Sequence, residues 1–88
     1  MMRVSVIVVT LRRPLPLRQA VASILACRHD SFELLVADQN APGETAALLA
    51  EWAGDARLRI LHMPPVGLSA AQNRAAAEAR GEILLFTD

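Results

Sequence analysis

Three polar residues stand at the ends of apolar segments of this chain. Thr10 ends RVSVIVVT, Asp38 ends FELLVAD and Asp88 ends EILLFTD. If these segments are parallel strands, the three residues share one edge of a sheet, the edge at which open α/β folds bind ligands. Two carboxylates and a hydroxyl there would suit a ligand with donor groups, or a divalent cation with a phosphate. Alternatively, each aspartate caps the turn after its strand. Their matching positions together favour a binding site.

Sequence signatures of several other sites are missing. No Gly-x-Gly-x-x-Gly follows the first apolar segment, and a Gly-x4-Gly-Lys-Ser/Thr loop is excluded because the chain has no lysine. With two histidines and no nucleophile turn, a Ser-His-Asp arrangement has no support. Cys27 is the only cysteine, which excludes an internal disulfide or a cysteine metal cluster. We expect its thiol to pack as a small buried hydrophobe.

Length and composition indicate one small folded domain. The chain has 88 residues, of which 53% are hydrophobic. Nine basic and nine acidic residues cancel, so there is no electrostatic footprint for nucleic acid. No apolar run approaches the ~20 residues of a membrane span, and no secretory signal is visible. These features together predict a cytoplasmic protein.

Four segments carry the pattern of β-strands: Arg3–Thr10, Phe32–Asp38, Arg57–His62 and Glu82–Asp88. Three of them are nearly continuous apolar runs, which suits strands covered on both faces. The segment Arg57–His62 alternates polar and apolar residues, which suits an edge strand.

Three helical patterns lie between these strands. The first repeats apolar residues from Leu17 to Leu25, with Pro16 in its first turn. The second covers Ala46–Ala53. The third is predicted to open with the capping box of Ser69 and Gln72 and to close at Arg80-Gly81, with Gly81 at positive φ.

This alternation predicts an α/β fold. We expect a Rossmann-like, three-layer α/β/α arrangement with a four-stranded parallel sheet in the order 3-2-1-4. Asp88 is at the end of a strand, where the functional loops of such sheets begin. We therefore expect the chain to be the amino-terminal part of a larger fold.

Over its whole length the chain resembles the family 2 glycosyltransferases of GT-A fold. VSVIVVT with the following RP resembles their first strand and nucleotide loop, and ELLVAD resembles their second strand. GLSAAQNRAAAEARGEILLFTD resembles the stretch that leads to the Asp-x-Asp motif. The chain departs from the family at Leu11, often aromatic, at Gln39-Asn40 in place of Asp-Gly or Asp-Ser, and at Gln72 in place of arginine.

The resemblance implies a site for a nucleotide-sugar donor. Thr10 would line the base pocket, and Asp38 would accept the N3–H of uracil. Asp88 would be the first acid of Asp-x-Asp, near the ribose and the metal-bound diphosphate, and thus a metal ligand for Mn²⁺ or Mg²⁺ in the complete enzyme. Asn73 faces either the nucleotide or solvent. Arg12 and Arg13 either approach the phosphates or lie in a solvated loop.

Residues 1–88 would thus be the amino-terminal, nucleotide-sugar-binding portion of an incomplete GT-A domain. The resemblance implies an inverting transferase that uses a UDP-sugar and an unknown acceptor, with its catalytic base in a carboxy-terminal half. We expect the 88-residue chain alone to be inactive. The alternative is a non-catalytic α/β module or interaction fragment without a ligand. In either case the exposed last strand could pair with another chain.

Overall fold

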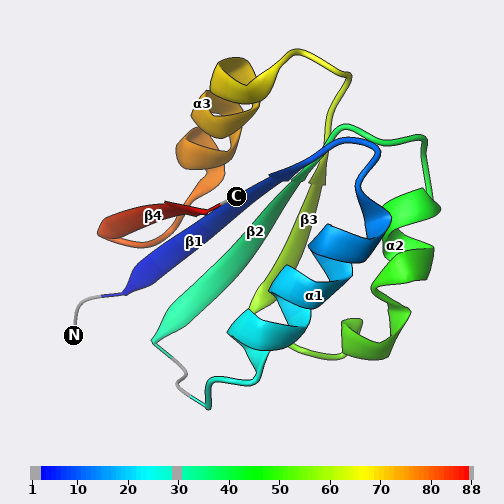
Figure 1. The fold of residues 1–88 in the computed structure, drawn as a ribbon. Coiled ribbons are helices and arrows are strands. Elements are labelled where there is room, and N and C mark those ends of the chain that lie inside the picture. Colours follow the sequence, from blue (N-terminus) through cyan, green and yellow to red (C-terminus); the bar gives the residue numbers. More distant parts are fainter. Residues whose placement is uncertain (1–2, 29–30, 88) are drawn as a thin grey trace.

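The computed structural model describes residues 3–28 and 31–87, which form a parallel sheet flanked by helices (Figure 1). The strands are β1 (Val4–Thr10), β2 (Phe32–Asp38), β3 (Leu58–His62) and β4 (Ile83–Thr87). The helices are α1 (Pro14–Leu25), α2 (Glu44–Leu48) and α3 (Leu68–Glu78), and a 3₁₀ turn, η1 (Ala50–Trp52), follows α2. The strands are all parallel and lie in the order β3-β2-β1-β4, which confirms the predicted topology.

Strand register brings the predicted strand ends to one edge. Thr10 of β1 pairs with Asp38 of β2, and Asp38 pairs with His62 of β3. On the other side of β1, Thr87 of β4 pairs with Val8. The loops that follow the strands therefore begin along the same edge of the sheet.

The two faces of the sheet have separate cores, because successive side chains of a strand point to opposite faces. Val8 packs with Leu17 and Val21 on the side of α1 and α2. Ile7 packs with Ala71 and Ala75 on the side of α3. Figure 1 shows the helices on these two sides, which confirms the three-layer arrangement.

The helix ends differ from the sequence prediction. The second helical pattern is divided, since α2 ends at Leu48 and η1 continues it as a 3₁₀ turn. The predicted capping box at Ser69 is wrong: α3 already begins at Leu68 and has no side-chain cap. Gly67 takes the N-cap position with a φ of 96°, a backbone conformation that a glycine adopts without steric cost.

Gly81 also has a role other than the predicted one. Its φ is not positive, and α3 has already ended at Glu78. A Cβ at this position would lie 2.5 Å from the Ser5 Oγ and 2.8 Å from the Arg3 carbonyl oxygen. Glycine is needed here because the segment before β4 passes directly against β1.

Cys27 is exposed, so the expectation of a packed thiol is wrong. The apolar face of α1 ends with the buried Leu25, and α1 itself ends at that residue. Cys27 therefore lies beyond the part of the helix that contacts the core.

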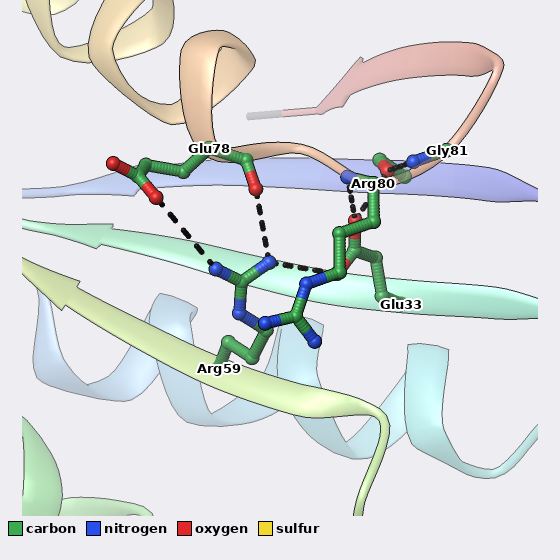
Figure 2. Close-up of polar contacts among 6 residues, drawn as sticks. Glu33, Arg59, Glu78, Arg80 and Gly81 are labelled. Carbon is green, nitrogen blue, oxygen red and sulfur yellow. Dashed lines mark hydrogen bonds and ion pairs between the residues drawn. The ribbon is translucent and has the colours of Figure 1, made fainter.

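A buried carboxylate joins the segment before β4 to the sheet (Figure 2). Glu33 Oε2 accepts hydrogen bonds from the Ser5 hydroxyl at 2.7 Å and the Arg80 amide at 2.6 Å. Its Oε1 accepts from Arg59 at 3.0 Å, and the Gly81 amide donates to Ser5 Oγ. Burial opposes ionisation of Glu33, but these hydrogen bonds and the charge of Arg59 outweigh it and lower its pKa.

The two edges of the sheet differ in character. Strand β3 carries Arg59 and is flanked by Arg57, and it lies at the edge as the sequence predicted. Strand β4 forms the other edge, and its apolar residues Ile83–Phe86 are 38–53% exposed, so the expectation that this apolar run is covered on both faces is wrong. Among the described residues, no helix is long and apolar enough to span a membrane.

Candidate functional site

A cleft opens where the direction of the chain across the sheet reverses. Strand β1 has β2 on one side and β4 on the other, while α1 and α3 lie on opposite faces (Figure 1). Such a switch point leaves a crevice beyond the carboxyl ends of the strands. Here it is a cleft of ≈ 490 Å³. Its lining comes from β1, α1, β4 and the segments that follow β2 and precede α3, and it includes Thr10, Arg13, Gln39, Gly67 and Thr87.

Thr10 lines this cleft and has an unpaired side-chain hydroxyl. The residue is only 4% exposed. Its Oγ1 is the one buried side-chain polar atom without a hydrogen-bond partner in the part of the chain that the structure describes. A buried hydroxyl without a partner costs free energy in the empty protein. A ligand atom that pairs with Oγ1 would recover this free energy on binding.

Asp38 organises the loop that follows β2. Its buried Oδ1 accepts three hydrogen bonds, from the Asn40 amide at 2.9 Å, the Asn40 side chain at 3.0 Å and the Thr45 hydroxyl at 2.8 Å. The other oxygen, Oδ2, lies 3.4 Å from Nδ1 of His62. Asp38 thus caps a turn through one oxygen and has the other directed toward the exposed ring of His62.

The loop after β1 is fastened to this turn. Asn40 Oδ1 accepts a hydrogen bond of 2.6 Å from the Arg12 amide. Arg12 has a φ of 56°, the left-handed conformation that glycine and asparagine adopt more readily than arginine. The contact with Asn40 therefore holds the chain in a strained turn between β1 and α1.

Gln39 connects β2 to the start of α3 from inside the cleft. Its buried Oε1 accepts hydrogen bonds from the Val66 amide at 2.8 Å and the Gly67 amide at 3.0 Å. Both partners are donors, which identifies the accepting atom as the oxygen. The position of the loop before α3 is consequently set by a side chain of the neighbouring strand end.

The structure brings only some of the predicted site residues together. Thr10 lines the cleft, and Asp38 lies beside it in register but is not part of the cleft wall. Asn73 is exposed on α3 and does not line the cleft. Asp88 lies outside the described residues, although Thr87 before it is on the cleft rim.

Sequence reasoning missed Gln39 and Thr45. Asx turns are common after strands, so the spacing of Asp38 and Asn40 carried a signal for the turn. The partners of Gln39 lie 27 and 28 residues further along the chain, and no local pattern indicates them.

The described residues offer little charge for a metal or an anion. Residues 3–28 and 31–87 contain no group of three His, Cys, Asp or Glu side chains that could hold a metal ion. Asp38 is engaged by its own turn. Arg13 is the one ionisable residue in the described cleft wall.

Comparisons with known proteins agree on one family. The sequence profile of Glycosyl transferase family 2 matches residues 5–88. The chain is 41% identical over 86 residues to O-antigen biosynthesis protein RfbC of Myxococcus xanthus, covering 96% of this chain and 7% of that protein. It is 30% identical to an uncharacterised glycosyltransferase of Rickettsia felis, covering 98% of this chain and 14% of the relative.

A solved structure extends the likeness to the fold. The mannosyltransferase PcManGT from Pyrobaculum calidifontis, determined with GDP-Man and Mn²⁺, superposes with a TM-score of 0.79 and 26% identity. The match covers 94% of this chain and 26% of that one. The chain therefore spans about a quarter or less of the length of these relatives.

Proposed function

The chain belongs to glycosyl transferase family 2, and on this premise we propose that it forms the nucleotide-sugar-binding part of a glycosyltransferase. The observation that carries the proposal is the cleft at the switch point, with the unpaired Thr10 hydroxyl in its wall. Ligands of open α/β sheets bind at this place in the topology. The likeness to a transferase solved with GDP-Man and Mn²⁺ supports a nucleotide sugar as the ligand.

We favour a UDP-sugar as the donor. Three donors already occupy Asp38 Oδ1, so Oδ2 is the oxygen left to accept from a base. Oδ2 has the ring of His62 at 3.4 Å as its neighbour, and its remaining acceptor capacity would match the single N3–H of uracil. Guanine offers adjacent N–H groups, which would be better served by a carboxylate with both oxygens available. The GDP-Man bound to PcManGT makes GDP the natural competitor in any test.

A divalent cation, Mn²⁺ or Mg²⁺, is expected with the diphosphate, because phosphates and one or two carboxylates are its usual ligands. Asp88 is the residue that would hold it. The described residues do not gather a ligand set of their own, so no step of this proposal depends on the metal.

In the complete enzyme we propose an inverting transfer. An acceptor hydroxyl would attack the anomeric carbon of the sugar, the bond from that carbon to the diphosphate would break, and a carboxylate base would take the hydroxyl proton. The residues described here contribute donor binding to this reaction. We propose that the acceptor site and the catalytic base lie in a further part of the complete enzyme, because this chain spans only a small part of its relatives.

Calorimetric titration with UDP and GDP tests the proposal. We expect UDP to bind more tightly than GDP, and Thr10→Val to weaken UDP binding by about fivefold to tenfold, the effect of one neutral hydrogen bond. The same substitution should raise the free energy of unfolding by ~1 kcal/mol, because it removes an unpaired buried hydroxyl. Thr10→Ser keeps the hydroxyl and serves as the matched control.

Two outcomes would overturn this function. Failure of the wild-type chain to bind either nucleotide would favour the alternative, an α/β module without a ligand. Equal affinities of Thr10→Val and wild type would remove Thr10 from the site.

A further inference from the structure

Arg13 has no role in the nucleotide site as proposed above. It is the N-cap residue of α1, it lies on the wall of the switch-point cleft, and it is exposed. Among the described residues of that wall it is the one ionisable side chain. The cleft thus has one positive charge and no negative charge within the described part of the chain.

The amino end of α1 adds a positive potential but few backbone donors. A helix N-terminus usually holds an anion with its free N–H groups and its dipole. Pro14 and Pro16 have no N–H group, and the Leu17 amide already donates to the Arg13 carbonyl at 3.1 Å. The first turn also carries no acidic residue that would offset the dipole. An anion at this end of the cleft must therefore be held chiefly by a side chain.

Thr10 is an independent sign that a ligand enters the same cleft. Its hydroxyl is buried, unpaired and part of the same wall as Arg13. A hydroxyl can donate to a phosphate oxygen or to a base, and a guanidinium donates only. The two side chains together suit a ligand with several oxygen acceptors and a negative charge.

We infer that Arg13 binds the diphosphate of the nucleotide. This inference rests on the proposed function of the cleft as a nucleotide-sugar site. The guanidinium pairs with phosphate oxygens through charge-assisted hydrogen bonds, and the α1 dipole strengthens their attraction. Arg13 thereby supplies the positive charge that the missing lysines and glycine loop would supply in other nucleotide folds.

The neighbouring Arg12 is not suited to the same task. It borders a different depression, whose wall includes the Glu44 carboxylate, and it does not line the cleft. A phosphate beside Arg12 would be repelled by Glu44. Two adjacent arginines therefore have different surroundings, and Arg12→Gln provides a matched control for Arg13→Gln.

The experiment compares the affinities of UDP, uridine and inorganic pyrophosphate for three proteins: wild type, Arg13→Gln and Arg12→Gln. Arg13→Gln should weaken UDP and pyrophosphate about tenfold or more, as expected for the loss of a charge-assisted contact, and leave uridine unchanged. Arg12→Gln should leave all three affinities unchanged. Raising NaCl from 0.1 to 0.5 M should weaken UDP binding to wild type more than to Arg13→Gln, because salt screens an exposed charge pair.

Different results would refute the role of Arg13 and the proposed nucleotide-binding function. If wild type binds neither UDP nor uridine, the proposed function fails and Arg13 has no nucleotide to hold. If wild type binds UDP and Arg13→Gln binds it equally well, the function stands and the role of Arg13 is refuted. If uridine and UDP weaken by the same factor, Arg13 contacts the nucleoside or supports the fold, which also overturns the inference.

Discussion

Glu33 joins β2 to the segment before β4, and its replacement by glutamine would test this connection. The carboxylate is 6% exposed and accepts hydrogen bonds from Ser5, Arg80 and Arg59. Glutamine keeps one acceptor oxygen and places an NH₂ group where the other oxygen was. Turned one way, that NH₂ group meets Arg59, which can only donate; turned the other way, it meets the Arg80 amide, also a donor, beside the Ser5 hydroxyl.

The expected loss follows from these contacts. The least harmful orientation points the NH₂ group at Arg59, which is partly exposed and can turn toward water. One charge-assisted bond is then lost and two others become neutral, which costs about 2–3 kcal/mol. A domain of this size has a total stability of roughly 4–13 kcal/mol. The melting temperature of Glu33→Gln should therefore fall by about 10–20 °C.

Acid sensitivity provides a second measurement. The pKa of Glu33 is lowered in the folded state, so its contribution is complete above the ordinary glutamate pKa of about 4.3. The contribution is lost as pH falls through the folded-state pKa. Between pH 6 and pH 3, urea unfolding should thus show a larger loss of stability for wild type than for Glu33→Gln. The lowered pKa of Asp55, caused by its hydrogen bonds with Arg57, is common to both proteins and cancels.

Glu51→Gln is the control, because Glu51 forms an exposed ion pair with Arg18. Such a pair contributes at most about 1 kcal/mol, so this variant should unfold close to wild type. Equal stability of Glu33→Gln and wild type at pH 7, or parallel pH profiles, would refute the role assigned to this carboxylate.

Two further predictions concern the turn after β2 and the open edge of the sheet. Thr45→Val removes a buried donor to Asp38 Oδ1 and should lower the free energy of unfolding by about 2 kcal/mol in urea titrations, whereas Thr45→Ser, which retains the hydroxyl, should lose less. The exposed apolar strand β4 should also cause concentration-dependent association, which sedimentation velocity would detect; Leu85→Lys should reduce it, and an unchanged sedimentation profile would count against pairing through this edge.

The strands and their order were predictable because their signals are local and strong. β-branched and apolar runs mark the strands, and alternation with helices leaves few possible topologies. The edge position of β3 followed from its alternating pattern, which the charged Arg59 illustrates. The family resemblance also followed from contiguous motifs, and the profile match over residues 5–88 confirms it.

The features that could not be predicted depend on contacts between distant segments. Gly81 ends a helical pattern and so suggested a C-cap, but its real constraint is the backbone of β1 more than 70 residues away in sequence. Gln39 gains its role from amides near α3. Ser69 matched a capping box, yet Gly67 started the helix earlier. Of the four predicted site residues, Asp38 was the most ambiguous, because the same carboxylate caps a turn through one oxygen and presents another.

The tight approach at Gly81 has a consequence for how this sequence tolerates variation. Any side chain there would wedge β4 away from β1 at its amino end. Thr87 is the last residue of β4, and it lines the cleft. A rigid strand transmits such a wedge along its length. In a saturation mutagenesis scan scored by ligand retention, Gly81 would therefore rank with the residues of the cleft wall, although it lies at the opposite end of the sheet.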